Sequence, residues 1–232
     1  MMTAHQIPSA HLPAPRKAWI HRATAGEAKD CLLFLDGELY TERVKAPAIL
    51  CEASAGALRP VTCVYLPNAS AAGRHADYTC NAAFADFLAR EMPAWIEREA
   101  GRFERVFLCG LSLSALQAVF TALRHPCVFA GVLAQSPSAW WQDERLAQSL
   151  PAMPATPNRC WLSVGTQELQ TNVSHPPTPL VQKTSQLDSV RRLSAAMTAA
   201  GHTIHLNEYD GGHDPACWGE ELTEALAWLM KA

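Results

Sequence analysis

The stretch Arg105-Val-Phe-Leu-Cys-Gly-Leu-Ser-Leu-Ser-Ala-Leu-Gln-Ala-Val-Phe120 decides how the rest of this sequence is interpreted. It predicts a buried apolar strand that passes through one tight turn straight into a helix. Ser112 stands at the centre of that turn, with the small residues Gly110 and Ser114 two positions to either side. Small residues are needed there because the strand and the helix pass close together. The turn therefore lifts the Ser112 hydroxyl above the carboxyl end of a strand.

A serine at such a strand-to-helix turn is what the G-x-S-x-G pattern of nucleophilic serines requires. Ser112 is therefore the candidate nucleophile. The backbone NH of Leu113 is a candidate donor to an oxyanion, because it lies at the positive end of the helix dipole. A second oxyanion donor is expected at Gly37, in the glycine turn that ends an early strand. The alternative for Ser112 is a buried serine that only caps its helix.

A nucleophilic serine needs a histidine base and an acid that holds the imidazole. In an architecture with this turn the histidine comes last in the chain, and His213 follows the last expected strand in a turn with two glycines. Glu168 follows the preceding strand and is the candidate acid. Asp210 and Asp214 flank His213, but sequence neighbours seldom reach the far nitrogen of the ring. The alternative for Glu168 is an exposed loop carboxylate without a role.

Short apolar runs alternate with longer helical patterns along the whole chain. This alternation predicts an α/β fold with a mostly parallel central sheet flanked by helices. The expected strands are Ala18–Arg22, Cys31–Leu35, Val61–Leu66, Arg105–Gly110, Phe129–Ala134, Cys160–Val164 and Ile204–Tyr209. The expected helices are Ala46–Ala57, Asn81–Glu99, Leu113–Arg124, Glu144–Leu150, Val181–Ala200 and Pro215–Met230.

The length of 232 residues is typical of one α/β domain. Residues 1–17 hold three prolines and no periodicity, so we expect a loose N-terminal arm followed by a single catalytic domain over residues 18–232. The proline-rich stretch Leu169–Leu180 is expected to be a long loop. Loops of this length in compact domains are often lids or binding loops.

Charge and apolar patterning exclude several classes of function. The 19 Lys and Arg against 22 Asp and Glu give a net charge of −3 and a pI near 6.3, which argues against nucleic-acid binding. Apolar runs reach only about six residues, far short of the roughly 20 that span a bilayer. His202 and His205 have no third metal ligand at a suitable spacing, so we expect no metal and no other cofactor.

The cysteine pattern and the N-terminus favour a cytoplasmic location. Eight cysteines are scattered without any C-x-x-C spacing, which is typical of free thiols, although their even number leaves an oxidised alternative open. The first 30 residues hold prolines and basic residues but no continuous apolar core. They therefore do not form a secretory signal.

Four sequence blocks, spread over about residues 30–230, resemble the enterochelin (ferric enterobactin) esterases, a branch of the esterase D-like α/β hydrolases. The blocks are Leu33-Phe-Leu-Asp-Gly-Glu38, Arg74-His-Ala-Asp-Tyr-Thr-Cys-Asn-Ala-Ala-Phe84, Cys109-Gly-Leu-Ser-Leu113 with Ala134-Gln-Ser-Pro-Ser-Ala-Trp-Trp141, and Asp210-Gly-Gly-His-Asp214 with Cys217-Trp218. The double tryptophan and the D-G-G-H-D-x-x-C-W run are the most specific. The resemblance implies the α/β-hydrolase fold.

The resemblance also implies a reaction, the hydrolysis of ester bonds in the tri-serine lactone of a catecholate siderophore, with the same nucleophile, base and acid. It implies that Arg74, Asn81, Trp140 and Trp141 contact the substrate. A ferric tris-catecholate is trianionic and aromatic, so a guanidinium and a stacking surface suit it. Iron would enter only as part of that small-molecule substrate.

Departures from the branch bear on the geometry of the turn and the shape of the substrate more than on the reaction class, and two other functions stay open. Ser114-Ala115 stands where branch members have Gly-Gly, and Pro137 stands where they have Gly. One alternative is a general small carboxylester or thioester hydrolase of the same fold, without a siderophore role. The other is a non-catalytic α/β-hydrolase scaffold that binds a siderophore or a protein partner.

Overall fold

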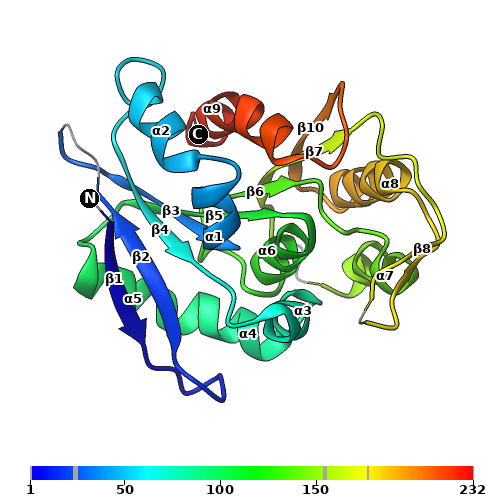
Figure 1. Cartoon of the computed structure of the whole chain (residues 1–232), viewed down its shortest axis with the longest axis horizontal. Coiled ribbons are helices and arrows are strands. Elements are labelled where there is room, and N and C mark those ends of the chain that lie inside the picture. The colour runs from blue at the N-terminus through cyan, green and yellow to red at the C-terminus, as the bar shows by residue number, and fades with distance from the viewer. Residues whose placement is uncertain (1, 23–25, 154–155, 177, 232) are drawn as a thin grey trace.

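A mixed sheet of eight strands, in the order β1-β2-β4-β3-β5-β6-β7-β10, runs through the centre of the computed structural model (Figure 1). The structure describes residues 2–22, 26–153, 156–176 and 178–231. β2 pairs antiparallel with both β1 and β4, and the remaining neighbours pair parallel. The strands are β1 (Met2–Ile7), β2 (Arg16–His21), β3 (Asp30–Leu35), β4 (Val61–Leu66), β5 (Arg105–Leu111), β6 (Gly131–Gln135), β7 (Arg159–Gly165) and β10 (Thr203–Tyr209).

Helices connect the strands and cover both faces of the sheet, as Figure 1 shows. One apolar core lies between the sheet and α1, α2 and α9, and a second lies between the other face and α4, α5, α6 and α8. The helices are α1 (Gly37–Glu42), α2 (Ala46–Ala53), α3 (Ala71–Tyr78), α4 (Ala82–Asp86), α5 (Met92–Glu99), α6 (Ser112–Arg124), α7 (Trp141–Ser149), α8 (Gln186–Ala199) and α9 (Pro215–Met230), with a π-helical turn η1 (Phe87–Glu91) and a 3-10 turn η2 (Leu150–Ala152).

The central strands are buried along their whole length. All six residues of β3 and of β4 are buried, as expected for strands that helices cover on both sides. The predicted α/β class with a mostly parallel sheet is confirmed. Each of the seven predicted strands is present, with its ends shifted by no more than two residues.

The N-terminal residues correct one prediction. Residues 2–7, expected in a loose arm, form the edge strand β1, which pairs with β2 from Met2 opposite His21 to Ile7 opposite Arg16. Ile7 is only 1% exposed, whereas most of β1 faces solvent. An edge strand with so little buried surface has no apolar alternation for a sequence pattern to show. The prediction of a single catalytic domain over residues 18–232 stays a prediction.

The helical predictions differ most before α8. The predicted helix over Val181–Ala200 begins at Gln186, because Val181–Gln182 form β9 and pair antiparallel with β8 (Val173–Ser174). Within the expected long loop, Leu169–Leu180, only Val173–Ser174 are strand and most of the other described residues are irregular; Pro177 lies outside the described residues. The predicted helix over Asn81–Glu99 is present as α4, η1 and α5. It contains a π-helical turn just before Pro93, a residue that has no NH to continue the α-helical bonding.

The passage from β5 into α6 depends on a close backbone approach at Gly110. A Cβ atom at this position would lie 2.5 Å from the carbonyl oxygen of Ser114 and 2.7 Å from the nitrogen of Ala115. Both atoms belong to the first turn of α6 and cannot move aside without disturbing the helix. Only glycine therefore lets the helix begin immediately after the strand.

Replacement of Gly110 by alanine should lower the free energy of unfolding by about 1–3 kcal/mol, the usual cost of overpacking. Urea denaturation of the purified protein measures this change. Gly56→Ala is the matched control because a Cβ at Gly56 has no neighbour within 4 Å, and it should change stability by less than about 0.5 kcal/mol. Equal stability of the two variants would contradict the close approach.

Candidate active site

The turn at Ser112 joins the end of β5 to the first residue of α6. Ser112 has a φ of 53°, in the left-handed region that few side chains adopt without a structural reason. Ser114 Oγ accepts a hydrogen bond from the NH of Leu111 at 3.0 Å and donates one to the Leu111 carbonyl at 2.8 Å. The small hydroxyl that replaces glycine here therefore closes the turn with bonds of its own.

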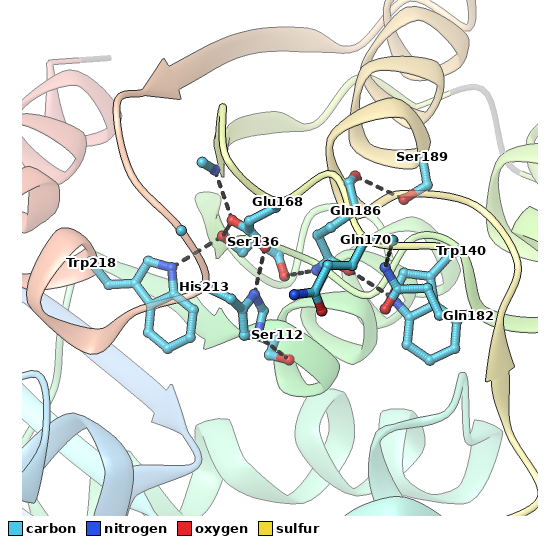
Figure 2. Close-up of polar contacts among 12 residues, drawn as sticks. Ser112, Ser136, Trp140, Glu168, Gln170, Gln182, Gln186, Ser189, His213 and Trp218 are labelled. Atoms are coloured by element: carbon cyan, nitrogen blue, oxygen red, sulfur yellow. Dashed lines mark hydrogen bonds and ion pairs between the residues drawn. The ribbon is translucent and has the colours of Figure 1, made fainter. Parts of the chain in front are cut away.

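Three residues from distant parts of the chain meet above the carboxyl ends of the strands, as Figure 2 shows. Ser112 Oγ lies 2.9 Å from His213 Nε2, and His213 Nδ1 lies 2.6 Å from Glu168 Oε2. When Nδ1 carries the proton it donates to the carboxylate, and Nε2 accepts from the serine hydroxyl. The imidazole is 42% exposed, whereas the Glu168 side chain is only 3% exposed. The structure thus brings the three predicted residues within hydrogen-bonding reach.

The loops that carry the acid and the histidine are bonded to each other. Thr166 NH donates to the Tyr209 carbonyl, and Gln167 NH donates to the Gly211 carbonyl, each at 2.9 Å. A side chain at Gly165 would collide with that Gly211 carbonyl. Glycine at this position therefore allows the loop after β7 to lie against the loop after β10, and this contact sets the distance between the acid and the histidine.

One oxygen of Glu168 is held by three donors while the other faces His213. Oε1 lies 2.7 Å from Ser136 Oγ, 2.8 Å from the NH of Gly165 and 3.2 Å from the Tyr209 hydroxyl. Trp218 Nε1 lies 3.1 Å from the Ser136 hydroxyl oxygen and 3.1 Å from the Tyr209 hydroxyl oxygen, as a donor to each. This set of bonds fixes the orientation of the carboxylate, so that Oε2 remains for the imidazole.

The environment of Glu168 favours its ionised form. Burial alone would raise the pKa of this carboxyl. The hydrogen bond and charge of His213, together with the donors Gly165 NH and Ser136 Oγ, outweigh burial and bring the pKa below its ordinary value. Glu168 therefore carries a negative charge at neutral pH.

The two predicted oxyanion donors follow neighbouring strands. Gly37 is the first residue of α1, just after β3, and Leu113 lies in the first turn of α6, just after β5. β3 and β5 are adjacent and parallel, so both residues lie at the same edge of the sheet as Ser112. Their role as oxyanion donors stays a prediction.

A cavity of about 340 Å³ opens beside Ser112 and His213. Its wall combines the acid and histidine loops with Trp140 and with the β8–β9 hairpin, which contributes Val173, His175 and Gln182. Trp140 is therefore the one predicted substrate-contact residue that the structure places in this wall.

The other three predicted substrate contacts have structural partners. Arg74 forms a bidentate ion pair with Asp36, with distances of 2.8 and 2.6 Å, and the Asp36 side chain is fully buried. Asn81 caps α4 by accepting from the NH of Phe84 at 3.0 Å. Trp141 is 8% exposed and packs in the core. None of these three is among the described residues that line the cavity.

Several residues of the site were not predicted. Ser136 directly follows β6, the strand next to β5, so the rule that parallel strands end at the same edge could have placed it beside Ser112. Gln170, Gln182 and Gln186 carry no such signal, because glutamine is an ordinary surface residue and the hairpin that brings them together was predicted to be part loop and part helix.

Metal and membrane signals are weak in the part of the chain that the structure describes. No group of three or more His, Cys, Asp or Glu side chains there could hold a metal ion. Likewise, no helix among residues 2–22, 26–153, 156–176 and 178–231 is both long and apolar enough to cross a membrane.

Comparison with curated proteins finds siderophore esterases. The chain is 26% identical over 237 residues to the iron(III) enterobactin esterase of Dickeya dadantii, an alignment that covers 96% of this chain and 53% of that protein. It is 29% identical over 143 residues to the iron(III) salmochelin esterase of an Escherichia coli O6:H1 strain, covering 59% of this chain and 32% of that protein. The chain spans about half the length of the enterobactin esterases that it matches.

Solved structures show the same fold. The enterobactin esterase of Shigella flexneri, crystallised in the presence of enterobactin, aligns with a TM-score of 0.84 at 24% identity, over 99% of this chain and 59% of that chain. An IroE-like serine hydrolase from Shewanella oneidensis aligns with a TM-score of 0.80 at 19% identity, over 100% of this chain and 80% of that chain.

A family model described as "Putative esterase" matches residues 9–229. This range includes every strand from β2 to β10, the serine turn and the loops that carry Glu168 and His213. The chain therefore belongs to this esterase family.

Proposed function

We propose that this chain is a serine esterase in which Ser112 is the nucleophile, His213 the general base and Glu168 the acid. The observation that carries this proposal is the unbroken chain of contacts from Ser112 Oγ through both nitrogens of His213 to Glu168 Oε2. Membership of the esterase family supports the same reaction class. A binding scaffold without catalysis would have no need to align these three groups.

The geometry gives each group a step in ester hydrolysis. His213 Nε2 removes the Ser112 proton as Oγ attacks the ester carbonyl, and the ionised Glu168 stabilises the imidazolium that forms. The NH groups of Leu113 and Gly37 are the proposed donors to the oxyanion. The imidazolium then protonates the leaving alcohol, and a water molecule activated by the same histidine cleaves the acyl-enzyme.

We propose a catecholate siderophore with a tri-serine ester backbone as the natural substrate. The relatives of the chain are enterobactin and salmochelin esterases, and the largely buried indole of Trp140, 6% exposed, gives the cavity wall an aromatic part together with the ring of His175. A cytoplasmic location belongs to this proposal, and the eight free cysteines are compatible with it.

Loss of either Ser112 or His213 should abolish turnover. Ser112→Ala and His213→Ala should each lower kcat on a 4-nitrophenyl ester by roughly 10³-fold or more, because the two residues act as a unit. Absorbance of released nitrophenolate measures the rate. Ser54→Ala, in the α2 C-cap, is a control that should retain full activity. Turnover that persists in both active-site variants would remove the assignment.

Glu168→Gln should keep the shape of the site and lose the charge, lowering kcat by roughly 10²- to 10⁴-fold.

The difference in the free energy of unfolding between wild type and Glu168→Gln should also depend on pH. Because the pKa of Glu168 is lowered from 4.5 in the folded protein, its ionised form stabilises the fold above that pH, and this contribution is lost on acidification. Urea denaturation should therefore show the gap between wild type and variant shrinking below about pH 4.5. A gap that widens there would contradict the pKa direction.

The substrate proposal predicts a preference for the siderophore ester over a short acyl ester. Wild-type kcat/KM for the tri-serine catecholamide lactone, measured by chromatography of its products, should exceed that for 4-nitrophenyl acetate by about 10²-fold, because the aromatic arm adds contacts in the cavity. Comparable values for the two substrates would favour the general carboxylester or thioester hydrolase.

A further inference from the structure

The wall of the cavity is rich in amides and has no cation. Of the described residues that line it, none is a lysine or an arginine, and four are glutamines: Gln167, Gln170, Gln182 and Gln186. Its titratable members are Glu168, His213 and His175. Since Glu168 is ionised, the lasting charge at this wall is negative.

Two cations, Arg74 and Lys183, are each paired with a carboxylate outside the cavity lining. Both nitrogens of Arg74 that face Asp36 are within 2.8 Å of its carboxylate, and taking Arg74 away would leave a buried charge alone, which is costly. Lys183 follows Gln182 in sequence, but its ammonium lies 3.0 Å from Asp143 on the surface. An anionic substrate group entering the cavity would therefore lose hydration without meeting a lysine or arginine among the described residues of its lining.

The aromatic part of the wall is held in place. Trp140 Nε1 donates to Gln186 Oε1 at 2.6 Å, and the Gln186 amide nitrogen donates to the Ser136 carbonyl. The ring of His175 stacks on the indole with centroids 4.8 Å apart and planes 9° apart. The indole is thus fixed from two sides, so this part of the wall loses little conformational entropy when a ligand binds in the cavity.

Gln170 supplies a free amide at the same cavity. The backbone carbonyl of Gln170 accepts from Gln182 Nε2 at 3.1 Å, but within the described part of the chain the side-chain amide of Gln170 has no hydrogen-bond partner. Figure 2 shows this side chain between His213 on one side and Trp140 on the other. It can therefore donate to or accept from a neutral polar group of a substrate, such as an amide or a phenol.

We propose that this cavity selects an uncharged aromatic amide arm of the ester substrate and discriminates against an anionic one. The inference rests on the proposed esterase function and narrows its substrate class. For a catecholate siderophore it means that an arm enters as a catechol that keeps its protons, rather than as a metal-bound catecholate. A cavity of about 340 Å³, at the small end of the range for ligand pockets, accommodates one such arm at a time.

The test uses two esters of equal shape and different charge. The probes are 4-nitrophenyl esters of N-benzoylglycine, one with a para-sulfonamide on the benzoyl ring and one with a para-sulfonate. Wild type should show a kcat/KM at least about tenfold higher for the sulfonamide, the size expected for one unpaired charge close to a carboxylate at moderate dielectric. Equal rates, or a faster sulfonate, would overturn the proposal.

Charge placed at Gln170 should move this ratio in opposite directions. Gln170→Lys should lower the sulfonamide-to-sulfonate ratio several-fold, Gln170→Glu should raise it, and the neutral variant Gln170→Met should leave it near the wild-type value. Because the ratio compares two substrates on one protein preparation, loss of folded enzyme cancels. A ratio that is the same in the Lys and Glu variants would also overturn the proposal.

Failure of the proposed function is a separate result. If wild type hydrolyses neither ester and also leaves 4-nitrophenyl acetate intact, the esterase assignment itself fails. If it hydrolyses both aryl esters without regard to charge, the esterase assignment stands and only the neutral-arm selection is lost.

Discussion

The contact between the loop after β7 and the loop after β10 governs the whole site. Gly165 lies against the Gly211 carbonyl, and two backbone hydrogen bonds fasten the loops there. Because both strands are parallel and adjacent, their carboxyl ends already share one edge of the sheet. The contact turns that general proximity into a specific one, with the carboxylate of Glu168 facing the imidazole of His213. The serine needs only to be presented at the same edge.

Much of the fold follows from local patterns that the packing later reinforces. The apolar runs of β3, β4 and β5 are continuous because helices cover both faces, so a pattern of apolar residues identifies them. β1 escapes prediction because it has one deeply buried side chain, Ile7. The β8–β9 hairpin has strands of only two residues each, too short for any period to appear.

The candidate site likewise has residues that the sequence can predict and contacts that it cannot. Ser112, Glu168 and His213 could be predicted because chain order and strand-to-loop position constrain them. The ion pair of Arg74 with Asp36 could not be predicted from sequence, because the two residues are 38 positions apart and the sequence does not show that this carboxylate is buried. The contact of Arg74 with a substrate stays a prediction. Sequence identifies the type of side chain, and tertiary packing decides whether it remains free.

The β8–β9 hairpin has a consequence for how the protein could diversify. One continuous segment, from Gln170 to Gln186, supplies five of the residues around the cavity, while two of the three groups aligned for chemistry, Ser112 and His213, lie far outside it. Substitutions or insertions within this segment can therefore reshape recognition and leave the reacting atoms in register. In the proposed esterase, most residues that would contact the ligand and the residues that would cleave the bond are therefore encoded in separate stretches of the chain.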